Sequence, residues 1–285
     1  MFWRRTPKQP TPPAAPEAEL QRPQASLASD VGCHRELNED SGRIVWAEAG
    51  PRGDRGVLVM VADGMGGHQA GEVASQTAVE TIELEYPRAK GNPGQALEQA
   101  FQKAHRRIRQ LTESNPAMKG MGTTCTAVAI VGAGAWAAHV GDSRLYLIRG
   151  DDIYQLSEDH TQCMELVRQG LMTLEQARHH EDRNVLVRAM GSRPELALMS
   201  WPEPMAVKPG DRFLICSDGL HDLVADMEMR DVVRGAGAEE ACRKLVTMAK
   251  ERGGYDNITV AVIAIPAAGG SAENVKETRQ FEVAE

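Results

Sequence analysis

Six acidic residues of this chain could do chemistry, because each stands at the end of a stretch that resembles a β-strand. They are Glu39, Asp40, Asp63, Asp142, Asp218 and Asp256. A single aspartate in this setting usually bonds its own backbone and forms a turn. If all six meet at one end of the sheets, their charges would repel one another strongly unless cations lay between them. Ligands that are all oxygen select a hard ion, so the pattern predicts Mg²⁺ or Mn²⁺.

Hydrolysis of a phosphoester is the reaction that such a centre would perform. Two metal ions that share carboxylates turn a water molecule into a nucleophile near neutral pH. In the stretch VLVMVADGMGGH (57–68), an apolar run ends on Asp63 and glycines follow. A phosphate-binding loop would need Gly-Lys-Ser/Thr here, and a dinucleotide site would need GxGxxG. Neither is present, which leaves an acid at a sheet edge among small residues that allow close approach to a cation.

Other phosphatase chemistries do not fit the sequence. A cysteine-dependent phosphatase needs Cys-x5-Arg, and the nearest pair, Cys163 and Arg168, is one residue short. No Asp-x-Asp-x-Thr run is present for an aspartyl-phosphate intermediate. His179 and His180 are adjacent, and adjacent residues point apart on a helix. They are therefore expected to form solvated surface rather than a pair of metal ligands.

The composition is that of a globular protein. With 285 residues, 42% hydrophobic and 25% charged, the chain could form one large domain or two small ones. Its net charge of −8 would repel nucleic acid and anionic lipid, so proteins or small molecules are the expected partners. The stretch 125–141 is short for a membrane span and contains Gly132 and Gly134, so no membrane insertion is expected. The five cysteines form no CxxC pair, which argues against disulfides and zinc and favours the cytoplasm.

Three segments are predicted along the chain. Residues 1–24 contain six of the 15 prolines and few large apolar side chains, which predicts a disordered Pro-rich arm. Arg4 and Arg5 are not followed by an apolar segment, so a twin-arginine export signal is not expected. Residues 25–265 are predicted to form one domain, and residues 266–285 a flexible tail.

Strand-like and helix-like stretches fall into blocks. Strands are predicted at 25–32, 42–48, 56–62, 123–131, 135–141, 144–150, 211–217 and 257–265, and helices at 70–86, 93–114 and 239–253. Strands grouped with strands, with two helices inserted back to back, favour an α+β fold in which two antiparallel sheets pack together and helices cover them. Residues 160–190 are heavily charged with a short helical period, which predicts a helical flap beside the site.

Eight motifs give the chain a resemblance to a known family. They are GCHRELNED (32–40), VADGMGGH (61–68), MGTTCTA (121–127), HVGDSRLYLIR (139–149), LSEDHT (156–161), LVRAMG (186–191), DRFLICSDGL (211–220) and GGYDNITVAVI (253–263). In their order and spacing the chain resembles the bacterial metal-dependent serine/threonine protein phosphatases of the PPM, or type 2C, family. The resemblance spans nearly all of the predicted domain. It implies an αββα sandwich with two metal ions in the cleft between the sheets.

The resemblance also implies roles for single residues. The two metal ions would be held by Asp40, Asp63, the Gly64 carbonyl, Asp218 and Asp256, with Glu39 reaching one of them through water. Arg35 matches the arginine with which family members grip the substrate phosphate. Asp63, which would touch both ions, and Arg35 are therefore the expected catalytic residues.

One position departs from the family pattern. Some members place a histidine two residues after the bridging aspartate as a proposed general acid, and here that residue is Met65. His68 lies nearby but is expected to bond the turn as a structural residue. The group that protonates the leaving alkoxide is thus unassigned, and a metal-bound water is the alternative.

The role of Asp142 is the most open among the acids. Resemblance to bacterial members suggests that it helps to hold a third metal ion, with Asp218 shared and Asp222 completing the site. Asp218 and Asp222 are four residues apart, so both carboxylates could face one cation from a helix. The alternative is that Asp142 only caps the turn before Ser143 and Arg144.

Together these features predict an enzyme that hydrolyses phosphoserine and phosphothreonine in proteins and opposes a cognate Ser/Thr kinase. It would bind two or three Mn²⁺ or Mg²⁺ ions and act as a monomer. A regulatory binder that had lost catalysis would show gaps among the carboxylates or lack Arg35, and the sequence has no such gap. Phosphatases of anti-sigma-antagonist proteins are a second alternative, but these commonly lack the flap and the arginine.

Overall fold

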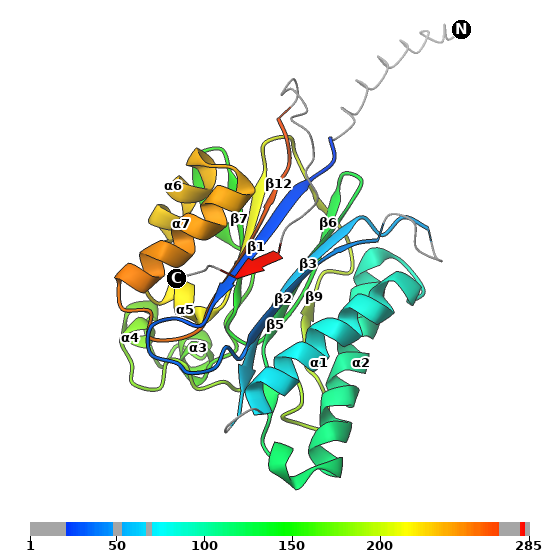
Figure 1. The fold of residues 1–285 in the computed structure, drawn as a ribbon, viewed down its shortest axis with the longest axis vertical. Helices are drawn as coiled ribbons and strands as arrows, with labels where there is room; N and C mark the ends of the chain where they lie inside the picture. The colour runs from blue at the N-terminus through cyan, green and yellow to red at the C-terminus, as the bar shows by residue number, and fades with distance from the viewer. Residues whose placement is uncertain (1–20, 48–52, 67–69, 268–279, 283–285) are drawn as a thin grey trace, which may run out of the picture.

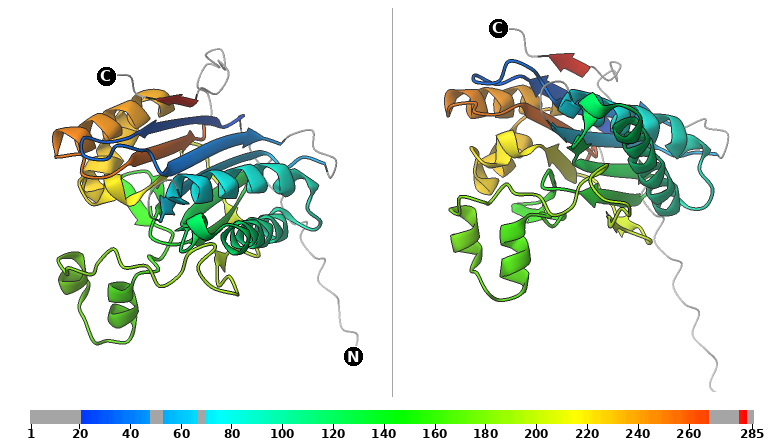
Figure 2. Two further views of the ribbon diagram at one scale, coloured as in Figure 1. Left: turned by 60° about the horizontal axis from the view of Figure 1, so that its bottom comes forward. Right: turned by 90° about the horizontal axis from the view of Figure 1, so that it is seen from below.

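Two β-sheets lie face to face in this protein, and helices cover the outer face of each sheet (Figures 1 and 2). The computed structural model describes residues 21–47, 53–66, 70–267 and 280–282. Within these residues every pair of named strands is antiparallel except β1 with β13. Antiparallel neighbours begin and end at the same edge of a sheet, which is what can bring strand-end residues together.

The first sheet has the strand order β13-β1-β12-β11-β7-β8. Its strands are β1 (Gln24–Asp30), β7 (Arg144–Arg149), β8 (Asp152–Gln155), β11 (Arg212–Cys216), β12 (Ile258–Ala264) and β13 (Gln280–Glu282). Every residue of β12 is buried, as its unbroken run of apolar and small side chains predicts for a strand covered on both faces.

The second sheet has the order β10-β6-β5-β3-β2, with β4 pairing with β3 and β9 with β6. Its strands are β2 (Asp40–Trp46), β3 (Val57–Met65), β4 (Gly122–Thr123), β5 (Cys125–Val131), β6 (Gly134–Val140), β9 (Met199–Ser200) and β10 (Met205–Ala206). The central strands β3 and β5 are buried over most of their length.

The helices complete a four-layer arrangement. They are α1 (Ala70–Glu85) and α2 (Pro93–Ser114) on the second sheet, and α5 (Asp218–His221), α6 (Asp226–Gly235) and α7 (Ala238–Glu251) on the first. Single-turn 3₁₀ helices span Tyr86–Arg88 and Pro116–Met118. Three apolar layers result, with Phe101 beneath α2, Phe213 between the sheets and Leu245 beneath α7.

The start of α2 shows how local sequence fixes an element. The Asn92 side chain accepts a hydrogen bond from Gln95 N–H (2.9 Å), and the Gln95 side chain accepts one from Asn92 N–H (3.1 Å). Pro93 occupies the first helical position, where its missing N–H is not needed. From there Leu97 and Phe101 recur on the buried face.

The flap projects from the body beside the first sheet (Figure 2). It consists of residues 160–190 and contains two short helices, α3 (Gln162–Arg168) and α4 (Leu174–Arg178). Both begin at a threonine, Thr161 or Thr173, whose side chain accepts a hydrogen bond from the first turn. The remainder of the flap has no regular helix, so the predicted helical character is correct only for these two segments.

The predicted α+β fold, with two antiparallel sheets flanked by helices, is confirmed. The sequence missed β8 and α6, and α6 was hard to see because its only buried side chains are Met229 and Val233. Gln24, placed in the predicted arm, already belongs to β1, while residues 1–20 of that arm lie outside the described residues. In the tail expected to be flexible, β13 pairs with β1.

The described helices include none that is both long enough and apolar enough to cross a membrane.

Candidate metal centre

The acids predicted from the sequence lie at one end of the two sheets. Asp40 opens β2 and Asp63 lies near the end of β3, and the two residues are directly opposite each other in the strand pair. Asp142 follows β6, Asp218 follows β11 and Asp256 precedes β12. Side chains directly opposite each other on neighbouring strands lie about 5 Å apart at Cβ. The fold therefore concentrates negative charge at this end.

Asp40 is buried, and a hydrogen bond between the sheets holds one of its oxygens. Ser217 Oγ donates to Asp40 Oδ2 at 2.7 Å, and Thr259 N–H donates to Ser217 Oγ at 3.0 Å. Burial, and then the charges of Asp218 and Asp256, raise the pKa of Asp40 to about 7, although the Ser217 bond favours ionisation.

Asp63 is fixed through its backbone. Its N–H donates to Thr124 Oγ1 at 2.9 Å, and its carbonyl accepts bonds from Thr124 N–H (2.9 Å) and Thr123 Oγ1 (2.8 Å). The Thr124 hydroxyl also lies 2.7 Å from that of Ser143, in the turn after β6. Burial raises the pKa of the Asp63 carboxyl well above its usual range, and the charge of Asp40 adds to this.

Asp142 and Asp218 face the same problem of buried charge. Burial raises the pKa of both carboxyls, and the charge of Asp218 raises that of Asp142 further. His221 Nε2 donates to the Asp142 carbonyl at 3.0 Å, which ties α5 to the turn that carries Asp142. The same His221 favours ionisation of Asp218.

Asp222 differs from its neighbours because its pKa is lowered, by His221 of α5 and by donors from the flap. Burial would raise its pKa, but His221, Asn184 and Arg183 together lower it to about 2. Asn184 Nδ2 lies 3.3 Å from Asp222 Oδ2 and 3.3 Å from Asp218 Oδ2. Asn184 of the flap thus contacts the carboxylate of Asp218, in α5, and that of Asp222, the C-cap of α5.

The chain packs tightly where Gly64 and Gly71 lie against each other and against Glu39. A side chain would not fit at either glycine. Gly64 N–H donates to the Glu39 carbonyl at 3.1 Å. A Cβ on Gly64 would lie 2.1 Å from the Gly71 carbonyl oxygen, and a Cβ on Gly71 would lie 2.3 Å from Glu39 Oε1. Burial raises the pKa of Glu39, while the positive charge of Arg35 opposes that shift.

Arg35 lies at the rim, in the loop between β1 and β2. Its Nη2 donates to Asp256 Oδ2 at 2.8 Å, and its side chain is 48% exposed. The bond to Asp256 raises the pKa of Arg35, and the charges of Glu39 and Asp63 act in the same direction. Met65 pairs with Gly122 in the β3–β4 ladder. His68 lies outside the described residues.

Three buried carboxylate oxygens have no hydrogen-bond partner among the described residues. They are Glu39 Oε1, Asp40 Oδ1 and Asp218 Oδ1. A buried charged oxygen without a donor is costly, and a hard divalent cation is the partner that suits it. In the described part of the chain, no three His, Cys, Asp or Glu side chains already have the arrangement of a metal site. The oxygen donors fit Mg²⁺ or Mn²⁺ in kind, and the ligand set itself stays a prediction.

Asn257 holds the loop that leads into this centre. Its Oδ1 accepts a bond from Glu39 N–H at 2.8 Å, and its Nδ2 donates to the carbonyls of Val31 and Leu37, each at 2.9 Å. Only 4% of Asn257 is exposed. The residue just before β12 of the first sheet therefore sets the path of the chain where it enters the second sheet at Asp40.

Sequence reasoning gave no role to several of these supporting residues. Ser217, Thr123, Thr124 and Asn257 all lie within the motifs quoted above, and two of them adjoin a predicted ligand in the chain. That adjacency was the available signal. Asn184 and Arg183 come from the flap, more than thirty residues before the acids that they contact, and carry no local signal.

Comparison with known proteins decides the class of this chain. Residues 37–255 match the family model described as Protein phosphatase 2C. The chain belongs to the protein phosphatase 2C family. The membership predicted from the eight motifs is thereby confirmed.

Bacterial members of the protein phosphatase 2C family are similar over most of the chain. The serine/threonine protein phosphatase PstP of Mycobacterium tuberculosis is 37% identical over 235 residues, which are 82% of this chain and 43% of PstP. This chain thus matches less than half of the length of PstP. Protein phosphatase PhpP of Streptococcus pneumoniae is 34% identical over 249 residues, which are 84% of this chain and 96% of PhpP.

Solved structures of the protein phosphatase 2C family agree with the fold. The crystal structure of Mycobacterium tuberculosis PstP has a TM-score of 0.76 and 34% identity, and the match covers 86% of this chain and 99% of that one. A structure of the catalytic domain of PstP in complex with two manganese ions has a TM-score of 0.73 and 33% identity, covering 86% of this chain and 98% of that one. The manganese ions belong to that protein.

The carboxyl cluster should limit the stability of the metal-free protein at high pH. The pKa of a carboxyl in the unfolded chain is about 4. If its pKa is higher in the folded protein, the carboxyl stabilises the fold at a pH below about 4, and this stabilisation is lost as the pH rises through the folded-state pKa. We therefore expect the free energy of unfolding in chelator to fall between pH 5 and pH 8. Asp63→Asn should reduce this loss and raise the free energy of unfolding at pH 8 by about 1 kcal/mol or more.

Urea unfolding in EDTA at several pH values measures this effect. Glu98→Gln, at an exposed position of α2, is the control and should leave the pH dependence unchanged. An Asp63→Asn protein that is less stable than the wild type at pH 8 would show that these carboxyls do not repel one another.

Proposed function

We propose that this chain is a metal-dependent phosphatase that hydrolyses phosphoserine and phosphothreonine in proteins. The observation that carries the proposal is the group of buried carboxylate oxygens on Glu39, Asp40 and Asp218 that have no donor in the described part of the chain, beside an arginine at the rim. Such oxygens favour a hard cation, and Arg35 adds a cationic group suited to phosphate. The activity named for PstP and PhpP is in accord with this.

The residues proposed to hold two Mn²⁺ or Mg²⁺ ions share one property, an oxygen at the end of the sheets. They are Asp40, Asp63, the Gly64 carbonyl, Asp218 and Asp256, with Glu39 acting through water. When bound, such ions supply Lewis acidity and an activated water for in-line attack on phosphorus. Two manganese ions in the PstP structure support this number and this metal.

The chain's own groups prepare the centre in distinct ways. The Thr123 and Thr124 bonds keep the Asp63 backbone in place, so that its carboxylate need not be positioned by the cations alone. Ser217 occupies one oxygen of Asp40 and leaves the other for a cation. Asp256 holds one amino group of Arg35, and the remaining guanidinium donors can bind phosphate oxygens.

The proposed partners follow from this reaction. The substrates are phosphoproteins, and a cognate Ser/Thr kinase would form the phosphoesters that this chain removes. We expect cytoplasmic action as a monomer, and light scattering of the purified chain would test the monomer.

Hydrolysis of a phosphothreonine peptide by the purified chain, with and without Mn²⁺, tests the proposed function. We expect turnover that requires the metal and that Asp63→Asn abolishes, because an amide is a poor bridging ligand. Glu98→Gln should retain the wild-type rate, and circular dichroism should show both variants folded. Turnover by Asp63→Asn at a near wild-type rate would overturn the proposed centre.

Arg35→Ala should mainly weaken the binding of substrate. A hydrogen bond between charged groups is worth about 1.5 to 3 kcal/mol, so the Michaelis constant should rise about tenfold or more. Arg35→Lys should restore little, because an ammonium group cannot form two parallel bonds to phosphate. A Michaelis constant that stays constant while the affinity for Mn²⁺ falls would assign Arg35 to the structure of the centre instead.

Asp142 is proposed to help hold a third ion together with Asp218 and Asp222, and to assist protonation of the leaving alkoxide, which Met65 cannot protonate. We expect Asp142→Ala to retain two tightly bound metal ions, measured by calorimetry, and to lose most turnover of a phosphopeptide. The loss should be smaller for an aryl phosphate, whose leaving group hardly needs a proton. Equal losses for both substrates would remove the role in protonation, and full activity for both would leave Asp142 as a turn residue.

A further inference from the structure

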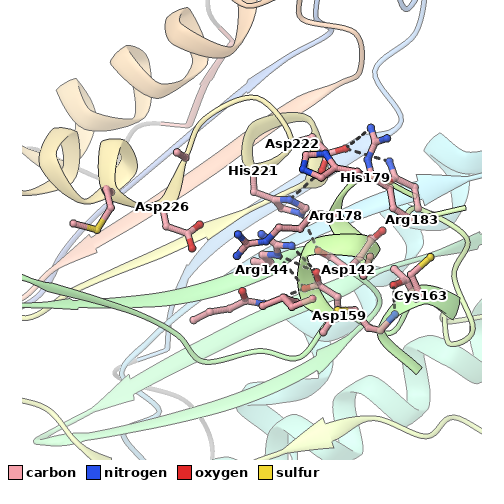
Figure 3. A pocket seen from close by; sticks show the side chains of 18 residues that line it. Asp142, Arg144, Asp159, Cys163, Arg178, His179, Arg183, His221, Asp222 and Asp226 are labelled. Carbon is pink, nitrogen blue, oxygen red and sulfur yellow. Dashed lines mark hydrogen bonds and ion pairs between the residues drawn. The ribbon is translucent and has the colours of Figure 1, made fainter. Parts of the chain in front are cut away.

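A pocket of about 760 Å³ lies between the flap and the body, next to the candidate centre (Figure 3). Asp142 and Asp222 belong to its lining, so the pocket begins where the carboxyl cluster ends. The flap contributes residues of α3 and α4, and the body contributes β7 and the segment from α5 to the start of α6. Any molecule that reacts at the centre therefore has this space beside it.

Three charged groups on the body side of the pocket, Arg144, Asp222 and Asp226, already have partners. Arg144 Nε donates to Asp159 Oδ1 at 3.0 Å, and Arg144 Nη2 donates to Asp159 Oδ2 at 2.6 Å. Asp226 accepts a bond from Tyr146 at 3.1 Å. Asp222 has its flap donors, as described above. Arg144 is therefore already engaged by Asp159 and is not available to an anionic ligand.

Arg178 is different. It ends α4, lines the pocket and is exposed, and it forms no hydrogen bond or ion pair with any residue in the described parts of the chain. The position of its backbone is nevertheless defined, because Thr173 caps α4 and the neighbouring Ala177 is buried. The structure thus presents an unpaired guanidinium from a defined position.

Apolar surface accompanies this charge. Leu174 is 47% exposed and lies four residues before Arg178, so both occupy one face of α4. Met227 is 55% exposed and lines the same pocket from α6. A ligand with an apolar stem and an anionic end matches this combination.

We propose that the pocket binds an acidic side chain of the phosphoprotein substrate, glutamate best of all, with Arg178 as its ionic partner. This inference rests on the proposed function and assigns a sequence preference to it. A carboxylate suits Arg178, because one guanidinium can bind both carboxylate oxygens. A second phosphate carries about two negative charges and would be repelled more strongly by Asp142, Asp159, Asp222 and Asp226. The two methylene groups of glutamate would lie against Leu174 and Met227.

Phosphothreonine peptides with one glutamate moved along an otherwise neutral sequence test the proposal on the full chain with Mn²⁺. We expect kcat/KM to rise about fivefold to tenfold at one position of the glutamate, through KM rather than kcat. In Arg178→Ala the ratio between the acidic and the neutral peptide should fall to about one. Arg178→Glu should instead prefer lysine at that position. Arg107→Ala, at an exposed arginine of α2 outside the pocket, is the matched control and should keep the wild-type ratio.

Each other outcome has a defined meaning. A wild-type ratio near one at every position, or an unchanged ratio in Arg178→Ala, would overturn the pocket assignment. A larger dependence on Arg178 for a second phosphothreonine than for glutamate would overturn the choice of a carboxylate. Failure of the wild type to hydrolyse even an aryl phosphate would refute the proposed function instead. In that case fluorescence anisotropy of the labelled peptides would still decide whether Arg178 selects the acidic one.

Discussion

Repulsion between carboxylates crowded at one end of two sheets is the constraint on which this structure depends. The strand pairing places Asp40 opposite Asp63, and the neighbouring sheet adds Asp218 from the end of β11. Burial and mutual charge raise the pKa of all three. A fold that only needed stability would separate these groups, because each buried charge without a partner costs free energy. Two hydrogen bonds hold the carboxylates in place against this repulsion. Ser217 donates to the Asp40 carboxylate, and the Asp63 N–H donates to the Thr124 hydroxyl.

The two sheets must also be held in register with each other at this end. Ser217 directly follows β11 of the first sheet and bonds Asp40 of the second. Asn257, at the start of β12, fixes the loop from which Glu39 and Asp40 enter β2. On the side of α1, Gly64 lies directly against the backbone of Gly71 and Glu39, which also fixes this part of the chain. Small relative shifts of the sheets would therefore separate oxygens that must act together, which explains why polar side chains rather than apolar packing join the sheets here.

Much of this arrangement could be predicted from the sequence, and the elements and contacts that could not be predicted have physical reasons for escaping notice. Unbroken apolar runs such as 257–265 predicted doubly buried strands, and the acids at their ends predicted the carboxyl cluster at one end of the sheets. The helix α6 escaped because its buried face is narrow, and β8 because three of its four residues are exposed and its side chains are mostly polar. Contacts such as that of Arg35 with Asp256, which are 221 residues apart, depend on how the sheets stack and have no local signal. Only the family resemblance linked these two motifs before the structure did.

The base of the flap is joined to the turn that carries Asp142. His160 N–H donates to the Gly141 carbonyl at 2.7 Å, and Gly141 N–H donates to His160 Nδ1 at 3.1 Å. The segment in which the chain leaves the flap is also bonded to His160, because Val187 N–H donates to the His160 carbonyl at 2.8 Å. Both ends of the flap therefore join at His160, which is bonded to Gly141, the residue before Asp142. This ties the base of the flap to the carboxyl cluster. Arg178 on α4 thereby lies in the same pocket as Asp142 and Asp222, although most of the flap surface is exposed to solvent.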